Sequence, residues 1–439
     1  MSVWSQARAL ARSTPPKRNR YIDFLRACAI LVVVIGHWLA AAPYASEEGL
    51  TIVRMLGVAP WLHGLTWALQ VMPVFFIVGG YANGASWEAA LRDHVPYRSW
   101  LHARLVRLMA PVVPLLLVWA GMCIVAGLAG AEPALIQNAS RLALIPTWFL
   151  AVYLLVVLLV PLTHAAWRRY GLASFWLPVS VAILVDALAF GRGFAMLRWT
   201  NYVFVWIAVH QLGYLWRSQR ADDPPLALGW CLGGLSFLVF LVLVANYPIA
   251  MLTVPGAEFS NTRPPTVALV ALAALQFGIV VLFQQPLRRW LRRPIPWTAT
   301  VLLNGSIMTV FLWHSTVQVL AIGSAYALGG VGLTWTPGSA VWWATRPLWI
   351  GAMLVMLLPF VALFARYERG SRRVQGAGPS QGRQIAGALL ACLGIGLLAG
   401  GGMSSPDVPW VRSWPLFAGL AGLALMLAHS HRVGVARQH

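Results

Sequence analysis

The chain has 439 residues, of which 59% are hydrophobic and only 10% are charged. Because a soluble domain carries about 25% charged residues, this composition excludes a water-soluble enzyme, a disordered chain and a secreted disulfide scaffold. The 32 basic residues against 12 acidic ones would suit a nucleic-acid partner, but the arginines stand singly or in pairs between apolar runs. We therefore expect a polytopic membrane protein whose partner is the lipid bilayer, with no nucleic-acid partner.

Twelve apolar stretches are long enough to cross a bilayer, which takes about 20 residues. The predicted fold class is all-α: a polytopic transmembrane helical bundle of about ten core spans plus a C-terminal two-helix hairpin. We expect the long ninth stretch to be tilted or broken near Gly323. The twelve stretches lie at 25–44, 64–86, 108–128, 146–166, 173–190, 199–216, 226–248, 265–284, 299–328, 345–366, 384–403 and 414–430.

The basic residues indicate an orientation. Assigned to the loops between these stretches, 24 Lys and Arg side chains fall on the side of the N-terminus and 7 on the opposite side, while Arg26 lies inside the first stretch. Since positive charge concentrates in cytoplasmic loops, we expect a multi-pass protein of a bacterial inner membrane with both termini in the cytoplasm.

The same pattern predicts four segments. Residues 1–20 form a basic cytoplasmic N-terminus, 21–370 the transmembrane core, 371–383 a cytoplasmic linker rich in Gly, Ser and Gln, and 384–439 the C-terminal hairpin and tail. The four cysteines stand alone inside apolar runs, so we expect core packing and no metal site.

Ionisable residues inside a membrane span are expensive, so each is a candidate for function. Arg26 and His37 are eleven residues apart, which places them on one helix face about 16 Å apart along the axis. Asp23 is three residues before Arg26 and can pair with it. The alternatives are a snorkelling anchor for Arg26 and a packing role for His37.

Further polar residues lie at a similar depth. Asp186 and His314 are about as far into their spans as His37, so a His–carboxylate pair could act as a base and its orienting acid. Sequence alone leaves open whether these spans touch or whether the side chains only pack. His210 and Asn304 are weaker candidates.

Two further patterns point to helix contact and to anion binding. Gly80 and Gly84 form a GxxxG pair, which lets another helix approach closely. Arg104 and Arg107 share one face before the third span, where they could hold the phosphates of a soluble anionic ligand or contact lipid headgroups.

These motifs, in this order and at these spans, resemble the acyltransferase 3 family of integral membrane acyltransferases. One departure is Gly79, where the family's FFxxSGY motif has serine. The resemblance covers about residues 20–370 and rests on Arg26-X10-His37, Phe75–Tyr81 (FFIVGGY), Arg104-X-X-Arg107 with Pro111, Thr147–Leu150 (TWFL) and Phe311–His314 (FLWH).

The resemblance implies an enzyme that moves an acyl group, often acetyl from acetyl-CoA, to a hydroxyl of a sugar, glycolipid, antibiotic or cell-envelope glycan. His37 would be the essential histidine, Arg26 its motif partner, and Arg104 and Arg107 the donor-binding cations. Acyl-CoA would be a substrate rather than a tightly bound cofactor.

Together the two lines of reasoning predict a mechanism. The pantetheine arm of the donor would lie beside Gly80 and Gly84, and His37 would act as general base on the acceptor hydroxyl. A covalent acyl-histidine stays open. The alternatives are a proton-coupled transporter or lipid flippase, for which the buried Asp and His would suit, and a structural component of envelope assembly.

Overall fold

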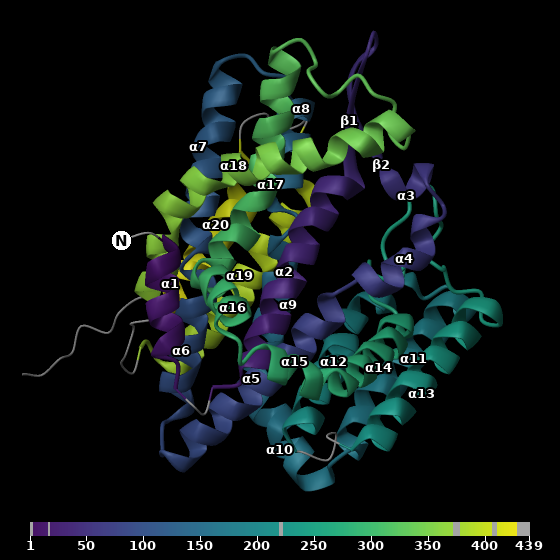
Figure 1. Cartoon of the computed structure of the whole chain (residues 1–439), viewed down its shortest axis with the longest axis vertical. Helices are drawn as coiled ribbons and strands as arrows, with labels where there is room; N and C mark the ends of the chain where they lie inside the picture. The colour runs from purple at the N-terminus through teal and green to yellow at the C-terminus, as the bar shows by residue number, and fades with distance from the viewer. Residues whose placement is uncertain (1–2, 16–17, 219–222, 372–377, 406–410, 428–439) are drawn as a thin grey trace, which may run out of the picture. The chain divides into compact units, whose positions relative to one another are not determined.

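The structure is a computed structural model that describes residues 3–15, 18–218, 223–371, 378–405 and 411–427. These residues form twenty α-helices, one short 3-10 helix and one two-stranded sheet. The predicted all-α class is therefore confirmed, and Figure 1 shows the long helices that make up the fold.

Membrane-spanning helices account for most of the chain. Within the described residues, eight helices are long and apolar enough to cross a bilayer, or up to ten if two bent helix pairs are each one span. Two of the twelve predicted spans correspond to the shorter helices α12 (Asn201–Arg217) and α20 (Ser413–Leu427). The chain is thus a multi-pass membrane protein.

The chain divides into two compact units, and the first contains residues 1–86 and 159–361. This unit contains Arg26 and His37. Its elements are α1 (Val3–Arg12), α2 (Arg20–Ala40), β1 (Ala41–Ser46), β2 (Gly49–Arg54), α3 (Met55–Val58), α4 (Leu62–Leu69), most of α5 (Met72–Arg92), α10 (Val160–Tyr170), α11 (Ala173–Arg192), η1 (Ala195–Thr200), α12, α13 (Pro224–Leu243), α14 (Val267–Leu282), α15 (Gln284–Trp290), α16 (Pro294–Gly305), α17 (Ile307–Ala327) and most of α18 (Ala340–Ser371).

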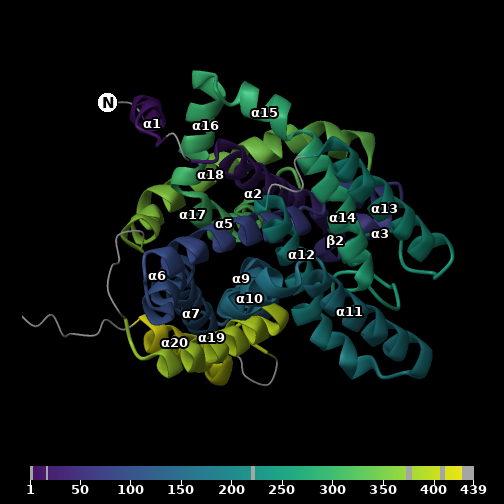
Figure 2. The same cartoon turned by 90° about the horizontal axis from the view of Figure 1, so that it is seen from below.

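The second unit joins residues 87–158 to the C-terminal hairpin. Figure 2 shows α19 and α20 side by side, and Gly394 and Gly422 sit where the two helices meet. The Cys392 thiol also contacts the Ala151 carbonyl at 3.2 Å, so the hairpin packs within this unit. The helices of the unit are α6 (Tyr97–Met109), α7 (Val112–Leu128), α8 (Pro133–Leu144), α9 (Thr147–Leu158), α19 (Gln381–Gly401) and α20.

The first predicted span ends earlier than expected. Helix α2 stops at Ala40, and residues 41–54 form the β1–β2 hairpin instead of extending the helix to residue 44. Pro43 lacks a backbone N–H and so cannot continue the helix, while Gly49 adopts a positive φ of 112° beside the turn. This places His37 in the last turn of α2.

The ninth predicted span is indeed broken, but at a different place. The break lies at Ser306, whose φ of −137° and ψ of 27° separate α16 from α17. Gly323, where we expected the break, lies inside α17. The adjoining Gly305 weakens the helix there, because glycine gains most freedom on leaving a helix.

Candidate active site

The site is built on two histidines from different helices. Nδ1 of His37 on α2 lies 2.8 Å from Nε2 of His314 on α17, and the two ring planes are almost parallel, 6° apart, with centroids 5.1 Å apart. His314 is fully buried and His37 half-buried. The structure therefore brings together two predicted site residues that are 277 positions apart in sequence.

The hydrogen bonds around His314 determine which nitrogens carry protons. Nδ1 of His314 lies 2.7 Å from the Phe311 carbonyl, which can only accept, so this nitrogen carries the hydrogen. In the neutral imidazole, Nε2 of His314 is then an acceptor, and Nδ1 of His37 donates to it. This assignment follows from the bonding pattern. It leaves Nε2 of His37 with a free lone pair, and this atom has no hydrogen-bond partner among the described residues.

Further bonds hold α2 and α17 together at this level. The indole N–H of Trp38 donates to the His314 carbonyl at 2.9 Å. The Gln318 amide donates to the His37 carbonyl at 3.3 Å and to the carbonyl of Ala41, the residue that follows α2, at 3.2 Å. These bonds join α17 to α2 and to the residue directly after it, so they hold the two histidines side by side.

Arg26 lies three turns before His37 on α2. Both side chains contact residues of the ninth predicted span, 299–328. Its Nε and Nη2 donate to Oδ1 of Asn304 on α16 at 2.9 and 2.6 Å, and Nη2 also reaches Asp23 at 3.3 Å. The predicted pair of Asp23 and Arg26 is therefore confirmed. Because α16 and α17 follow one another, the shared face of α2 that carries Arg26 and His37 packs along both.

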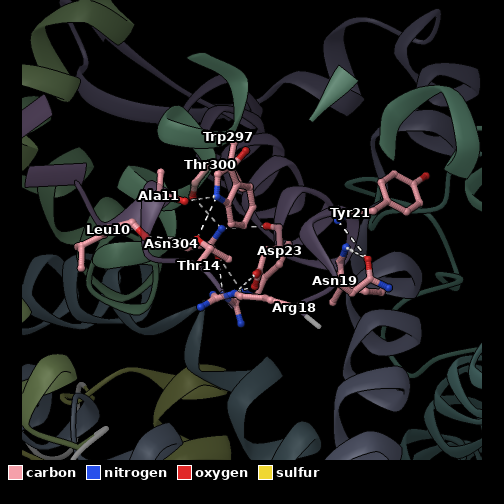
Figure 3. Close-up of polar contacts among 12 residues, drawn as sticks. Leu10, Ala11, Thr14, Arg18, Asn19, Tyr21, Asp23, Trp297, Thr300 and Asn304 are labelled. Carbon is pink, nitrogen blue, oxygen red and sulfur yellow. Dashed lines mark hydrogen bonds and ion pairs between the residues drawn. The ribbon is translucent and has the colours of Figure 1, made fainter. Parts of the chain in front are cut away.

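Asn304 ties this cluster to the backbone. Its amide N–H group donates to the Asp23 and Thr300 carbonyls, both at 2.9 Å, and Figure 3 shows Asn304 beside Asp23. Arg18 forms a second ion pair with Asp23 at 2.5 Å. With two guanidinium groups around one carboxylate, the cluster keeps one net positive charge.

The segment predicted as a basic cytoplasmic N-terminus contains a helix. Residues 3–12 form α1, which packs against α16, and the Trp297 indole donates to the Ala11 carbonyl at 3.2 Å and to the Thr14 hydroxyl at 3.1 Å (Figure 3). A spacing of apolar residues on one face, including the buried Ala7 and Ala11, was the available signal.

The expected pairing of Asp186 with His37 is wrong. The Asp186 carboxylate accepts hydrogen bonds from Asn201 at 2.8 Å, from the Tyr247 hydroxyl at 3.1 Å and from the Val267 N–H at 2.8 Å. It therefore caps the first turn of α14, where a negative charge complements the helix dipole. Similar depth in the membrane could not reveal this, because depth carries no information on which spans are neighbours.

Asp186 also affects its phenol partner in the segment between α13 and α14. Burial and the neighbouring carboxylate both raise the pKa of Tyr247 above its ordinary value, because each opposes a phenolate at this position. The hydroxyl therefore stays protonated and donates to Asp186. The hydrogen bond between Tyr247 and Asp186 therefore anchors the 244–266 segment to α11.

The expectation that Gly80 and Gly84 border an acyl arm is also wrong. A side chain at Gly80 would collide with the His210 backbone carbonyl, and one at Gly84 would approach the Tyr214 ring to 3.0 Å. Both glycines serve the close crossing of α5 with α12, which leaves no room for a ligand between them. His210 lies at the same crossing, 3.1 Å from the Asn83 amide, and so outside the imidazole pair.

The two predicted donor-binding cations lie in the second unit. Arg104 is half-buried on α6, with its guanidinium 5.8 Å from the centre of the Trp100 ring, and Arg107 one turn later is exposed. Residues three apart share a helix face, so Arg104 and Arg107 lie on one face of α6, as predicted. Among the residues that the structure describes, no three His, Cys, Asp or Glu side chains gather as metal ligands.

Comparison with known proteins identifies the family. A local match, 28% identical over 130 residues, links the chain to one component of the Na(+)-translocating NADH-quinone reductase of Chlamydia pneumoniae, and it spans 29% of this chain and a quarter of that protein. No solved structure matches the chain significantly. The acyltransferase 3 family, described as an acyltransferase domain, matches residues 19–366. This match runs from the start of α2 into α18 and covers the imidazole pair. The chain therefore belongs to the acyltransferase 3 family of membrane acyltransferases.

Proposed function

We propose that this membrane acyltransferase moves an acetyl group from acyl-CoA to a hydroxyl of a sugar, glycolipid or cell-envelope glycan, with His37 as general base. The observation that supports this proposal best is the imidazole pair itself. Nε2 of His37 has a free lone pair, while Nδ1 is held at 2.8 Å by a buried acceptor, Nε2 of His314. This is the arrangement a general base needs, because the second nitrogen is fixed by an orienting partner.

In the proposed reaction, the His37 imidazole alone takes up the proton and gives it back. Nε2 of His37 takes the proton of the acceptor hydroxyl as its oxygen attacks the thioester carbonyl carbon. The tetrahedral intermediate expels the CoA thiolate, which takes the same proton back from His37, so that an ester and free CoA result. During the step His314 accepts the hydrogen bond of the positively charged His37 ring and so stabilises it.

His314 is a positioning residue in this account. Its Nδ1 hydrogen bond to the Phe311 carbonyl fixes its own tautomer, which in turn fixes that of His37. Arg26 holds the beginning of α2 against Asn304 and so contributes to the register of the same two segments. We assign the phosphates of the donor to Arg104 and Arg107, since two cations on one helix face suit a polyanion.

The test uses membrane vesicles that contain the purified protein and a crude envelope lipid and glycan extract as acceptor. Acetyl-CoA labelled in its acetyl group is added, and base-labile label in the extract is measured. We expect His37→Gln to lower transfer by about 10²- to 10⁴-fold, the range of a general base. Arg104→Gln with Arg107→Gln should instead raise the KM for acetyl-CoA.

A matched histidine provides the control. His63 on α4 bonds to the Leu56 carbonyl at 2.7 Å and lies outside the imidazole pair, so His63→Gln should transfer at the wild-type rate. Wild-type turnover by a folded, membrane-inserted His37→Gln protein would refute the general-base role. Label transfer that depends on His37 but not on a CoA thioester would refute the donor.

A further inference from the structure

Helix α18 carries an enclosed arginine between two tryptophans. Arg346 is 3% exposed and Trp342 1% exposed, and the guanidinium carbon lies 4.4 Å from the ring centre of Trp342 and 5.6 Å from that of Trp349. Positions 342, 346 and 349 share one face of a helix. We refer to these three residues as the Arg346 cluster.

The cluster holds several hydrogen-bond donors that have no acceptor. Nη1 of Arg346 and the indole N–H groups of Trp342 and Trp349 are buried without a partner among the described residues. The other guanidinium nitrogens reach the Trp342 carbonyl at 3.1 Å, the Thr345 hydroxyl at 3.3 Å and the Gly332 carbonyl at 3.4 Å. Each unpaired buried donor is costly.

The charge of Arg346 also lacks a counter-ion. Within the part of the chain that the structure describes, no carboxylate forms an ion pair with it, in contrast to Arg18, Arg26 and Arg92. Stacking on indole rings offsets part of the cost of burying a cation, but rings cannot accept the in-plane hydrogen bonds of the guanidinium. A buried cation in a membrane span is a candidate binding residue for this reason.

The chemistry of the unpaired groups defines the missing ligand. All three are donors, so the complementary group offers acceptors only and carries negative charge, as a phosphate or a carboxylate does. A neutral sugar hydroxyl would leave the charge uncompensated. We propose that the Arg346 cluster binds an oxyanion, phosphate or carboxylate, carried by an amphiphile in the membrane.

The surroundings favour an amphiphile as the source of the anion. The cluster lies in one of the membrane-spanning helices, and its neighbour Leu348 is 78% exposed, as expected of a side chain that faces lipid. Trp342 packs in one apolar core with Ala42, Met55 and Leu39, and Leu39 is two residues after His37. If the proposed function holds, an amphiphile bound here is a candidate acceptor.

One hydrogen bond of the guanidinium goes to a glycine-rich segment. Residues 329, 330 and 332 are glycines with positive φ, and the Gly332 carbonyl makes the longest of the Arg346 hydrogen bonds, at 3.4 Å. An incoming oxyanion would replace this long hydrogen bond, in which only the guanidinium is charged, with a hydrogen bond between two charged groups.

The test is a binding measurement on the full chain in a neutral maltoside detergent. The protein is heated and the fraction that still elutes as a monodisperse peak in size-exclusion chromatography gives a thermal midpoint. This midpoint is measured at increasing concentrations of dodecyl phosphate, dodecanoate or inorganic phosphate. We expect a saturable rise of the wild-type midpoint with at least one of the two amphiphiles. In Arg346→Met the rise should disappear, and in Trp349→Phe, which loses one donor, the apparent Kd should weaken about tenfold.

Arg198 supplies a control, because it also lies over two aromatic rings, Phe190 and Phe259, and also has buried guanidinium nitrogens without a partner among the described residues. It differs from Arg346 in having the Asp186 charge nearby. Arg198→Met should keep the wild-type rise. A response to inorganic phosphate alone would support the site with a soluble anion as its source. An unchanged response in Arg346→Met and Trp349→Phe, or no response of the wild type to any of the three, would overturn the proposal. Acyl transfer is not measured, so this outcome is independent of the His37 mechanism.

Discussion

At the scale of single residues, the account depends on one hydrogen bond, that between His37 and His314. Sequence reasoning found both histidines, since ionisable side chains in apolar helices are conspicuous. It considered Asp186 as the partner of His37, because a carboxylate often orients a catalytic histidine, but left open whether the two spans touch. The structure gives this role to a second imidazole, whose tautomer is fixed by the Phe311 carbonyl.

Two substitutions at His314 separate a positioning role from simple packing. His314→Leu removes the acceptor for Nδ1 of His37, so kcat should fall roughly 10- to 100-fold while the KM for the donor stays unchanged. The amide oxygen of His314→Gln can still accept that bond, so this variant should recover part of the rate. Steady-state kinetics on equal amounts of folded protein give the answer. Equal losses in both variants would indicate packing alone.

Tyr247 gives a pH dependence with a definite sign. Because its pKa is raised in the folded state, the unfolded chain releases this proton first as the pH rises past about 10, the ordinary value for tyrosine. The folded state then binds more protons, and the free energy of unfolding falls with pH.

We therefore expect the wild type to lose stability between about pH 9 and 11 more steeply than Tyr247→Phe. Thermal midpoints of the two proteins, measured in parallel across this range, test the expectation, since the contributions of the other tyrosines cancel in the difference. Parallel curves would show that Asp186 does not hold the phenol in its protonated form.

At the scale of helices, the length of the apolar stretches predicted most of the spans, and the errors have physical causes. Residues 41–44 are apolar enough for a span, but Pro43 and the pairing of β1 with β2 end the helix at Ala40. The glycines Gly80 and Gly84 were recognised as a contact surface, yet only the structure identifies α12 as the helix that fills it. Composition indicates that a helix packs closely but does not name its partner.

The crossing of α5 with α12 can be tested directly. Gly80→Ala places a methyl group against the His210 backbone carbonyl, so the two helices must separate, and we expect a loss of about 1–3 kcal/mol, as for other overpacked cores. Gly233→Ala on α13 is the control, because its methyl group meets nothing within 4 Å and alanine favours a helix by up to about 1 kcal/mol. Thermal stability in detergent measures both. A Gly80→Ala protein as stable as Gly233→Ala would contradict the crossing.

At the scale of the whole molecule, composition and charge predicted a polytopic membrane protein, while the ordered motifs carried the family resemblance, which the family match confirms. The match ends at residue 366, close to the predicted core boundary at 370. The two compact units were not predictable, since the C-terminal hairpin packs with α6, α7, α8 and α9, and the sequence does not indicate which earlier helices are its neighbours. Sidedness remains a prediction from the distribution of arginines.

Cysteine labelling tests that orientation. In a protein whose four cysteines are replaced by serine or alanine, Glu47→Cys lies at the exposed tip of the β1–β2 hairpin and Arg292→Cys in an exposed basic loop. A maleimide that cannot cross membranes should label position 47 in intact cells and position 292 only after the membrane is opened. The reverse pattern would invert the topology.

The role of His37 in acyl transfer can be tested in cells that lack the gene and carry the wild type, His37→Gln or Asp186→Asn. Mass spectrometry of base-labile acyl groups on envelope lipids and glycans is the measurement, with protein levels checked in the membrane fraction. We predict the same acylated species with the wild type and Asp186→Asn, and its loss with His37→Gln. Acylation at the wild-type level with His37→Gln, or its loss with a stably inserted Asp186→Asn protein, would contradict the assignment.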